Sequence, residues 1–322
     1  MGAVDYLLYN LGLQDNTTWG IYHNKYNTSI RNVNGDPLND VNPIVRTILK
    51  KIPIIILPTI FIFFITCTLM CASIYLHFYE YINDIQVTIL LTIFMYIMFT
   101  IAHEAAHGSI SNNQFINNWV GRVSFATLGP TACFAGWKTL HLMHHKYTNH
   151  PEKDPDRYSS NTNNRLLLPV RWFTNAGYYV FFWLSLVDSD PAVTIYDKLE
   201  VVFQLTIHFT IFLLSFDFGY FYYFWTYWCL PSFLANGILI FAFDYLPHHK
   251  HFLTPNVNRY KTTSMLTVNA ILHRLTTVLF LYQNYHLLHH LYPTIPFYRY
   301  INQWNVKKSI ILPHDISFQP LF

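Results

Sequence analysis

The chain has 322 residues, of which 52% are hydrophobic and 11% are charged, whereas charged residues make up about 25% of a soluble domain. Its formal net charge of +3 is small, and no basic run with interleaved aromatics indicates a nucleic-acid partner. We therefore expect an integral membrane protein. The cysteines form no CxxC pair and are expected to be free thiols; they are Cys67, Cys71, Cys133 and Cys229.

A polar, Asn-rich arm comes first, over residues 1–51, and the rest of the chain, residues 52–322, is expected to form one domain. Four apolar stretches are long enough to cross a bilayer, which takes about 17–25 residues. They form two pairs with very short turns, at about 52–77 and 85–102, and 199–216 and 219–243. The expected fold is all-α, with four transmembrane helices in two hairpins and a helical cap.

The basic residues predict the orientation of these hairpins. All 20 Lys and Arg residues lie before, between or after the hairpins, and none lies in either turn. The positive-inside rule therefore places both termini and the cap in the cytoplasm. Two further apolar stretches, Trp119–Trp137 and Leu166–Val187, are interrupted by Arg122 and Arg171, so we expect interfacial or partly buried helices there.

Histidines gather in three groups beside the expected spans. His103 and His107 stand four apart, which would place both rings on one face if the second span continued as a helix. The other two groups both have the spacing HxxHH; they are His141, His144 and His145, and His286, His289 and His290. Neutral imidazole is a common ligand of transition metals. A lone HxxxH arises often by chance, but all three groups together predict metal binding.

Eight imidazoles exceed the four ligands of one tetrahedral zinc, which favours a two-metal site, and imidazole-rich ligation suits iron. A ninth candidate is His248, which follows the last expected span. Asp244 and Asn284 are expected to orient a ligand ring or hold a metal-bound water. The alternative for the segment after Asp244 is an interfacial anchor, to which His249 and His251 are assigned.

The three histidine groups, their order and their placement around two hairpins resemble the membrane fatty acid desaturase and hydroxylase superfamily. Segments typical of many members, acyl desaturases included, are similar to His144–Asn149 and Lys153–Asp156. Segments that look most like the carotenoid β-ring hydroxylases of bacteria and cyanobacteria are Phe243–Pro247, Gln283–Pro293 and Ile295–Tyr298. The resemblance covers roughly residues 85–305.

This resemblance implies two iron ions held by the eight grouped histidines and completed by His248, with no catalytic residue beyond the metal centre. Such centres use dioxygen to attack an unactivated C–H bond of a lipid. The first expectation is a carotenoid ring hydroxylase, and the alternative is a fatty acyl or sphingolipid desaturase. A hypothesis of another class, a histidine-rich metal transporter, would place ligands inside the spans, where only His208 lies.

The electrons for such a reaction must come from another protein. The sequence has no Gly-rich dinucleotide fingerprint and no CxxC-type iron–sulfur ligand run, so we expect a separate donor of ferredoxin or cytochrome b5 type. Basic residues could receive an acidic donor or contact lipid headgroups; they are Lys138, Lys146, Arg299, Lys307 and Lys308. The partners expected are this donor, the bilayer and a carotenoid or acyl chain.

Overall fold

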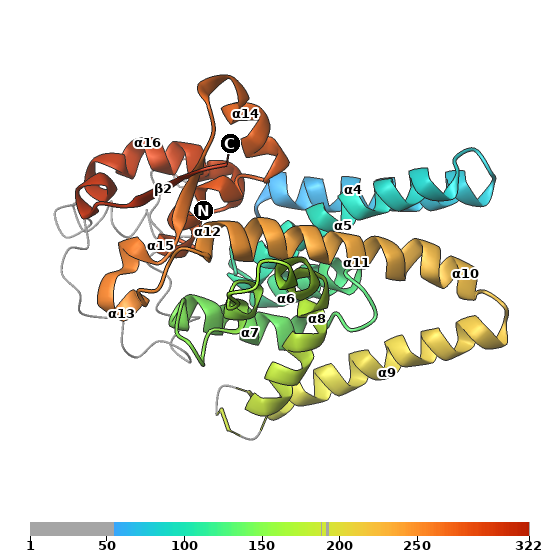
Figure 1. Ribbon diagram of the computed structural model, residues 1–322. Coiled ribbons are helices and arrows are strands. Elements are labelled where there is room, and N and C mark those ends of the chain that lie inside the picture. Colours follow the sequence, from blue (N-terminus) through green and yellow to red (C-terminus); the bar gives the residue numbers. More distant parts are fainter. Residues whose placement is uncertain (1–54, 188, 191–192, 322) are drawn as a thin grey trace.

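The computed structural model describes residues 55–187, 189–190 and 193–321, so the arm expected over residues 1–51 lies outside the described part. Among the described residues, four helical stretches are long and apolar enough to cross a membrane. They are α4 (Leu57–Phe78), α5 (Asp84–Ala106), α9 (Ile195–Asp217) and a continuous run over Phe221–His248. Figure 1 shows these helices running side by side, with the remaining elements gathered at one end. The expected helical membrane fold is confirmed.

Short turns join the four long helices into two hairpins, as expected. Asn83 begins α5 with a reciprocal cap, because its side chain accepts from the Gln86 amide and the Gln86 side chain accepts from the Asn83 amide. The second turn contains Gly219, whose φ of +72° favours glycine. His77 ties the hairpin ends together, with its ring nitrogens 2.8 Å from Asp84 Oδ1 and 2.8 Å from the Tyr227 hydroxyl.

Two helices extend further than the apolar stretches predicted. Helix α5 continues through His103 to Ala106, so the first histidine group lies at its C-terminal end. The last long helix continues through two π-helical segments, η2 (Trp225–Cys229) and η3 (Ile240–Tyr245), which alternate with α10 (Phe221–Phe224), α11 (Leu230–Leu239) and α12 (Leu246–His248). Asp244 and His248 therefore belong to this helix and do not follow it. The apolar pattern ends before the backbone hydrogen bonding does.

Three helices between the hairpins do not count among the candidate spans. The apolar stretch Trp119–Trp137 divides into α6 (Gln114–Ala126) and α7 (Phe134–Tyr147), because Gly129 has a φ of +116° and Pro130 follows it. Helix α8 (Leu167–Leu186) is absent from the described candidate spans and runs across their direction in Figure 1. The expectation of non-spanning helices in both stretches agrees with this arrangement.

The cap contains short helices and turns and one small sheet. Its helices are α13 (Pro255–Asn258), α14 (Ala270–Leu279), α15 (His286–Leu291) and α16 (Tyr300–Ile311). The turns are η1 (Pro155–Ser159), η4 (Arg259–Lys261), η5 (Gln283–Tyr285), η6 (Phe297–Arg299) and η7 (Leu312–His314). Strand β1 (Ser264–Thr267) pairs in parallel with β2 (Ser317–Pro320). The all-α expectation did not foresee this sheet, which holds the last described residues against the cap.

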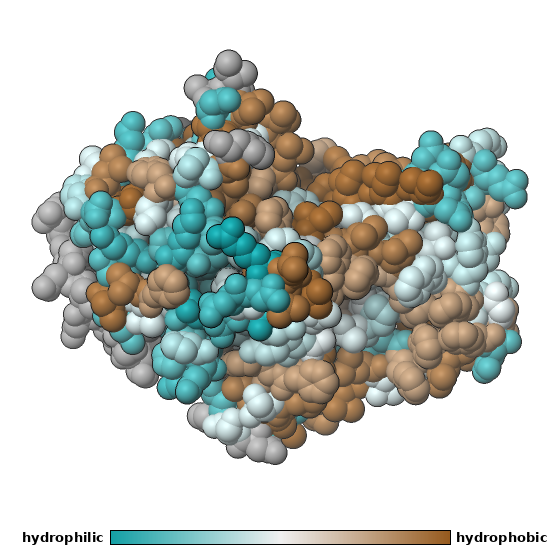
Figure 2. Space-filling view, in the orientation of Figure 1, coloured by the Kyte–Doolittle hydropathy of each residue, from teal (hydrophilic) through white to brown (hydrophobic). Residues whose placement is uncertain are grey.

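A buried carboxylate joins the cap to the long helices. Glu104 Oε2 accepts from the Thr59 hydroxyl of α4 at 2.9 Å, and its Oε1 accepts from the Phe297 amide of the cap at 2.7 Å. The apolar core of the bundle includes the fully buried Leu91, Met98 and Ile101 of the same helix, α5. Figure 2 shows apolar surface over the long helices, between hydrophilic surfaces on the cap and at the hairpin ends. The polar cap is thereby fixed at one end of an apolar bundle.

Candidate metal centre

The structure brings all nine candidate histidines into two adjoining groups. Within each group, one ring nitrogen of every histidine lies within 4.8 Å of those of the others. The first group contains His103, His107, His141, His145 and His289, and the second contains His144, His248, His286 and His290. All are buried except His290, which is half-buried. Rings from three separate sequence motifs therefore lie together, and His248 joins them; their role as metal ligands stays a prediction.

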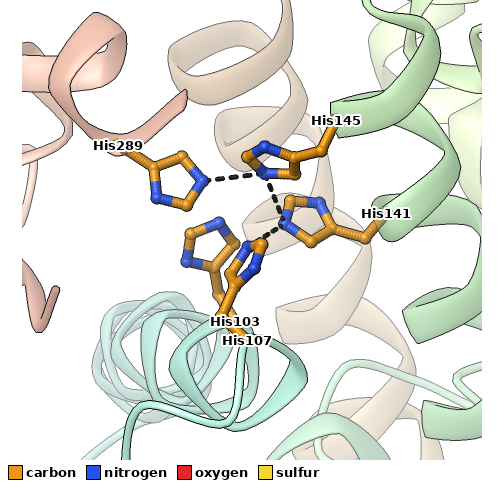
Figure 3. A group of neighbouring side chains, drawn as sticks. All are labelled: His103, His107, His141, His145 and His289. Carbon is orange, nitrogen blue, oxygen red and sulfur yellow. Dashed lines mark hydrogen bonds between the residues drawn. The ribbon is translucent and has the colours of Figure 1, made fainter. Parts of the chain in front are cut away.

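Helix α7 supplies both groups because of the spacing of its histidines. His141 and His145, four residues apart, turn toward the first group, while His144 contributes to the second. From α5, His103 and the C-cap residue His107 complete one side of the first group. Figure 3 shows these rings facing one another across the space between α5 and α7, with His289 approaching from the cap.

Helix α15 has the same HxxHH spacing as α7, but its histidines are assigned to the two groups the other way round. Its pair four residues apart, His286 and His290, lies in the second group, while His289 reaches the first. Residues three and four apart lie on neighbouring positions of one helix face, so a single turn can serve two adjacent centres. Each HxxHH motif therefore bridges the two groups.

The ring nitrogens of each group face one another closely. The Nε2 atoms of His107 and His141 are 2.8 Å apart, and those of His145 and His289 are 3.0 Å apart. In the second group, His248 Nε2 lies 2.9 Å from the Nε2 of His286. Several imidazoles with Nε2 atoms directed at one point fit a bound cation that accepts their lone pairs. A donor set of this kind suits iron, zinc, copper or nickel.

Neighbouring side chains hold three of these rings by the other nitrogen. The Nδ1 of His144 donates to Asp154 Oδ1 at 2.8 Å and lies 3.3 Å from Asp156 Oδ2. The Nδ1 of His286 donates to Gln283 Oε1 at 3.3 Å. These contacts place the ring proton on Nδ1 and leave the Nε2 lone pair for a metal.

His289 is oriented in the same way, because its Nδ1 lies 3.0 Å from the hydroxyl of Tyr300. Tyr300 is 1% exposed and stands at the start of α16. The Tyr300 hydroxyl therefore holds the His289 ring from inside the cap, where bulk water does not compete for the contact.

Burial sets the protonation of most of these rings. Desolvation lowers the pKa of His141, His145 and His289 well below its usual value, which keeps the rings neutral and able to bind a metal. Burial also disfavours the charged form of His144, but the carboxylates of Asp156 and Asp154 outweigh it and raise its pKa to about 9. The same carboxylates would stabilise a cation bound at His144.

The two further side chains predicted to support the centre lie in different surroundings. Asp244 lines a cavity with His144 and His286, and its Oδ2 is 3.4 Å from the hydroxyl of Tyr179. Its supporting role remains a prediction. Asn284 instead donates to Thr277 Oγ1 at 3.0 Å, because the turn before α15 directs its amide toward α14. The neighbouring Gln283 makes the contact with a ligand ring that was expected of Asn284.

Sequence reasoning assigned no role to Asp154, Gln283 or Tyr300. Asp154 lies in the Lys153–Asp156 segment, and an acidic residue shortly after a histidine motif is a usable signal for an outer contact. Gln283 stands three residues before His286, one helical turn away. Tyr300 carries no such signal, because only the folding of the cap brings it to His289.

The interfacial anchor expected around His249 and His251 is wrong for His251. This ring is 7% exposed; its Nδ1 donates to the Lys261 carbonyl at 2.9 Å, and its Nε2 accepts from the Ser264 hydroxyl at 2.7 Å. It therefore links the end of the last long helix to β1. His249 stacks on the ring of Tyr245.

The basic surface expected for an electron donor is smaller than predicted. Arg299 and Lys307 are 4% and 7% exposed, and the Lys307 ammonium lies over the ring of Tyr292. Lys138 donates to Asn118 Oδ1, and burial lowers its pKa to about 8. Of the five residues, Lys308 is exposed and Lys146 half-buried.

A cavity of about 120 Å³ opens beside both histidine groups. Its walls come mainly from α5, α7, α8, α9 and the last long helix, and are mostly apolar; they include Phe99, Trp137, Leu140, Val201 and Leu239. His103, His141, His144 and His286 line the same cavity. An apolar molecule inside it would therefore contact the candidate metal centre directly.

Residues 85–322, which are more than half of the chain, match the family model described as "Fatty acid desaturase". The chain belongs to this family. The resemblance noted from the three histidine motifs is thereby confirmed at the level of the superfamily.

Individual relatives agree with the family. The chain is 35% identical over 66 residues to an omega-3 fatty acid desaturase of Caenorhabditis elegans, covering 20% of this chain and 16% of that protein. It is 31% identical over 61 residues to the sn-1 acyl-lipid omega-3 desaturase (ferredoxin) of Synechocystis sp., covering 19% and 16%. A longer match, 24% identical over 249 residues, is to a chloroplastic omega-3 fatty acid desaturase of Sesamum indicum, covering 66% and 52%.

The matched segments span about half or less of the length of these relatives. All three are fatty acid desaturases, which favours the alternative raised from the sequence over the carotenoid ring hydroxylase expected first. The metal transporter hypothesis gains no support from the family.

Proposed function

We propose that the protein is an O2-dependent fatty acyl desaturase of the membrane that works with two iron ions. The observation that carries this proposal is the pairing of two buried histidine groups with an apolar cavity. Membership of the fatty acid desaturase family supports the same chemistry. A hydroxylase acting on a carotenoid ring is the second candidate, supported by the likeness of Gln283–Pro293 and Phe243–Pro247 to such enzymes.

Two iron ions held by the nine histidines would supply the activation of dioxygen and the removal of hydrogen from an unactivated carbon. The protein's own side chains supply the geometry. Asp154, Gln283 and Tyr300 keep three ligand rings turned inward. With ring orientation set in advance, metal binding requires little rearrangement of the site.

The cavity supplies orientation of the substrate and exclusion of water. Phe99, Trp137 and Leu140 line it beside His103 and His141, so a methylene chain packed against them would be held at the metals. Effective catalysis of this kind depends on placing the reacting carbon within a few tenths of an ångström. Placement of the chain therefore decides which carbons react.

An external electron donor is part of the proposal. Desaturation draws some of the electrons that reduce dioxygen to water from the acyl chain, and the rest must come from a redox protein. The printed name of one relative includes ferredoxin, which supports a small donor of ferredoxin or cytochrome b5 type. By the positive-inside rule, we place the cap, the metal centre and the donor on the cytoplasmic side.

Expression in cells that make β-carotene tests the proposal against the second candidate. Total fatty acids and pigments are analysed from the same culture, with a His289→Ala variant as the inactive control. A new double bond in the acyl pool that disappears in the variant supports desaturation. Unchanged fatty acids together with hydroxylated pigment would replace desaturation by carotenoid hydroxylation.

A further inference from the structure

Helix α14, over Ala270–Leu279, exposes apolar side chains along one side. Leu272, Leu275, Val278 and Leu279 are 40%, 56%, 59% and 62% exposed. Their spacing of three and four residues gathers them on a single helix face. Four large aliphatic side chains on one short helix form a concentrated apolar surface on the cap.

The opposite side of α14 is polar and faces the protein. Thr276 and Thr277 are 8% and 1% exposed, and the Thr277 hydroxyl accepts from Asn284 Nδ2 at 3.0 Å. The Nε2 of His273 lies 3.0 Å from the hydroxyl of Tyr285. A helix on a water-exposed surface turns its apolar side inward, so the polarity of α14 is inverted.

The position of α14 matches its inverted polarity. The hydroxyl of Tyr96 donates to the Leu279 carbonyl at 3.0 Å. Tyr96 lies in α5, seven residues before His103, which is about 10 Å further toward the hairpin turn. The C-terminal end of α14 is therefore beside the body of a candidate span. Figure 2 shows apolar surface in the region of α14 close to that of α4.

We propose that α14 is embedded in the lipid leaflet on the side of the metal centre, with bilayer acyl chains covering Leu272, Leu275, Val278 and Leu279. The exposed apolar sides of α4 and α5 continue this lipid-facing surface. Arg274, also exposed, can extend along the helix toward the headgroups. This inference does not depend on the reaction proposed above.

The consequence for the metal centre follows from the short connection after α14. Tyr282 donates its amide to the Thr277 carbonyl at 2.7 Å, and Gln283 donates its amide to the Phe280 carbonyl at 2.9 Å. Leu281 and Tyr282 have φ values of +45° and +65°, a costly backbone conformation that the surrounding contacts must hold. Gln283 then contacts the ligand ring of His286, so the bilayer would anchor the segment that carries the third histidine group.

Photolabelling from within the bilayer tests this proposal on the unaltered chain. The protein is reconstituted into vesicles of phosphatidylcholine that carries a diazirine on one acyl chain, and labelled peptides are mapped by mass spectrometry. We expect labels on Leu272–Leu279 as well as on the exposed residues Phe61 and Phe64 of α4. Helix α16 exposes Val306 and Ile310 at 49% and 41%, and these are expected to stay unlabelled.

Labels on α4 without labels on α14 would overturn the proposal, whether residues 1–54 or a second copy of the chain covered the helix instead. A matched pair of variants provides a second measurement. Leu275→Asp places a charge against the acyl chains and is expected to lower the thermal midpoint in vesicles, whereas Val306→Asp is expected to leave it unchanged. Equal midpoints for both variants would contradict a lipid-facing α14.

Discussion

At the scale of single residues, the candidate metal centre depends on side chains that hold the ligand rings by their outer nitrogens. Asp154, Gln283 and Tyr300 each contact the Nδ1 of a different histidine. Such contacts fix the direction of the ring, and the oxygens of Asp154 and Gln283 also place the proton of their rings on Nδ1. The geometry of the centre is therefore built into the cap before any metal arrives.

Tyr300→Phe tests this role by removing only the hydroxyl that lies 3.0 Å from His289 Nδ1. We expect metal affinity or activity to fall by roughly 10–100-fold, because the His289 ring loses the outer contact that Tyr300 provides. Iron content by atomic absorption and turnover in isolated membranes measure the effect.

Tyr227→Phe is the matched control, since Tyr227 makes the same contact with His77 Nδ1 at 2.8 Å but at the hairpin end of the bundle. Its iron content and turnover are expected to equal those of the unaltered protein. An equal loss in both variants would show that tyrosine removal acts through stability and not through ring orientation.

The sequence revealed the ligands better than their supports. The spacing of His141, His144 and His145 identifies them as a group, because helical periodicity places them on one turn. The contact between Tyr300 and His289 could not be foreseen, since it joins residues eleven apart through the fold of the cap. The contact of the Asn284 amide with Thr277 could not be foreseen for the same reason; its supporting role stays a prediction.

At the scale of elements, the crossing of α8 and α11 brings the wall of the cavity together. Gly237 of α11 allows close approach, because a Cβ there would lie 2.2 Å from the ring of Phe173 in α8. Gly237→Ala is expected to destabilise the protein by about 1–3 kcal/mol through overpacking. The thermal midpoint in detergent measures this change.

The control is Gly177→Ala on α8, where a Cβ meets nothing within 4 Å. Alanine has the higher helix propensity by about 0.5–1 kcal/mol, so this midpoint is expected to stay the same or rise. A fall of similar size in both variants would contradict close packing at Gly237.

The helices α5 and α12 end beyond the apolar stretches that predicted the spans. The apolar runs predicted both hairpins, because spanning a bilayer demands length and low charge. They did not predict that α5 reaches Ala106 or that the last long helix reaches His248. Both extensions carry polar residues into the centre, and backbone hydrogen bonding continues there regardless of side-chain polarity.

At the scale of the whole molecule, α5, α7, α8, α9 and the last long helix enclose an apolar cavity against the histidines. Gly136 lines it, and a Cβ there would lie 3.3 Å from Val201 Cγ2. Gly136→Leu should fill part of the cavity of about 120 Å³. We expect a lower yield of desaturated long-chain fatty acids and an unchanged amount of bound iron. Gas chromatography of total fatty acids measures the product.

Gly177→Leu makes the same exchange on the exposed side of α8 and is expected to preserve the product yield. Unchanged product with Gly136→Leu, or a loss that accompanies lost iron, would argue against the cavity as the site of the acyl chain. The sequence alone could not locate this cavity, because its walls come from helices that are far apart in the sequence.

The metal content of the purified protein tests the central claim most directly. The claim is that two histidine groups, represented by His289 and His290, hold two iron ions. We predict two irons per chain in the unaltered protein and fewer in both His289→Ala and His290→Ala. A protein without iron, or variants that retain the full iron content, would contradict the account.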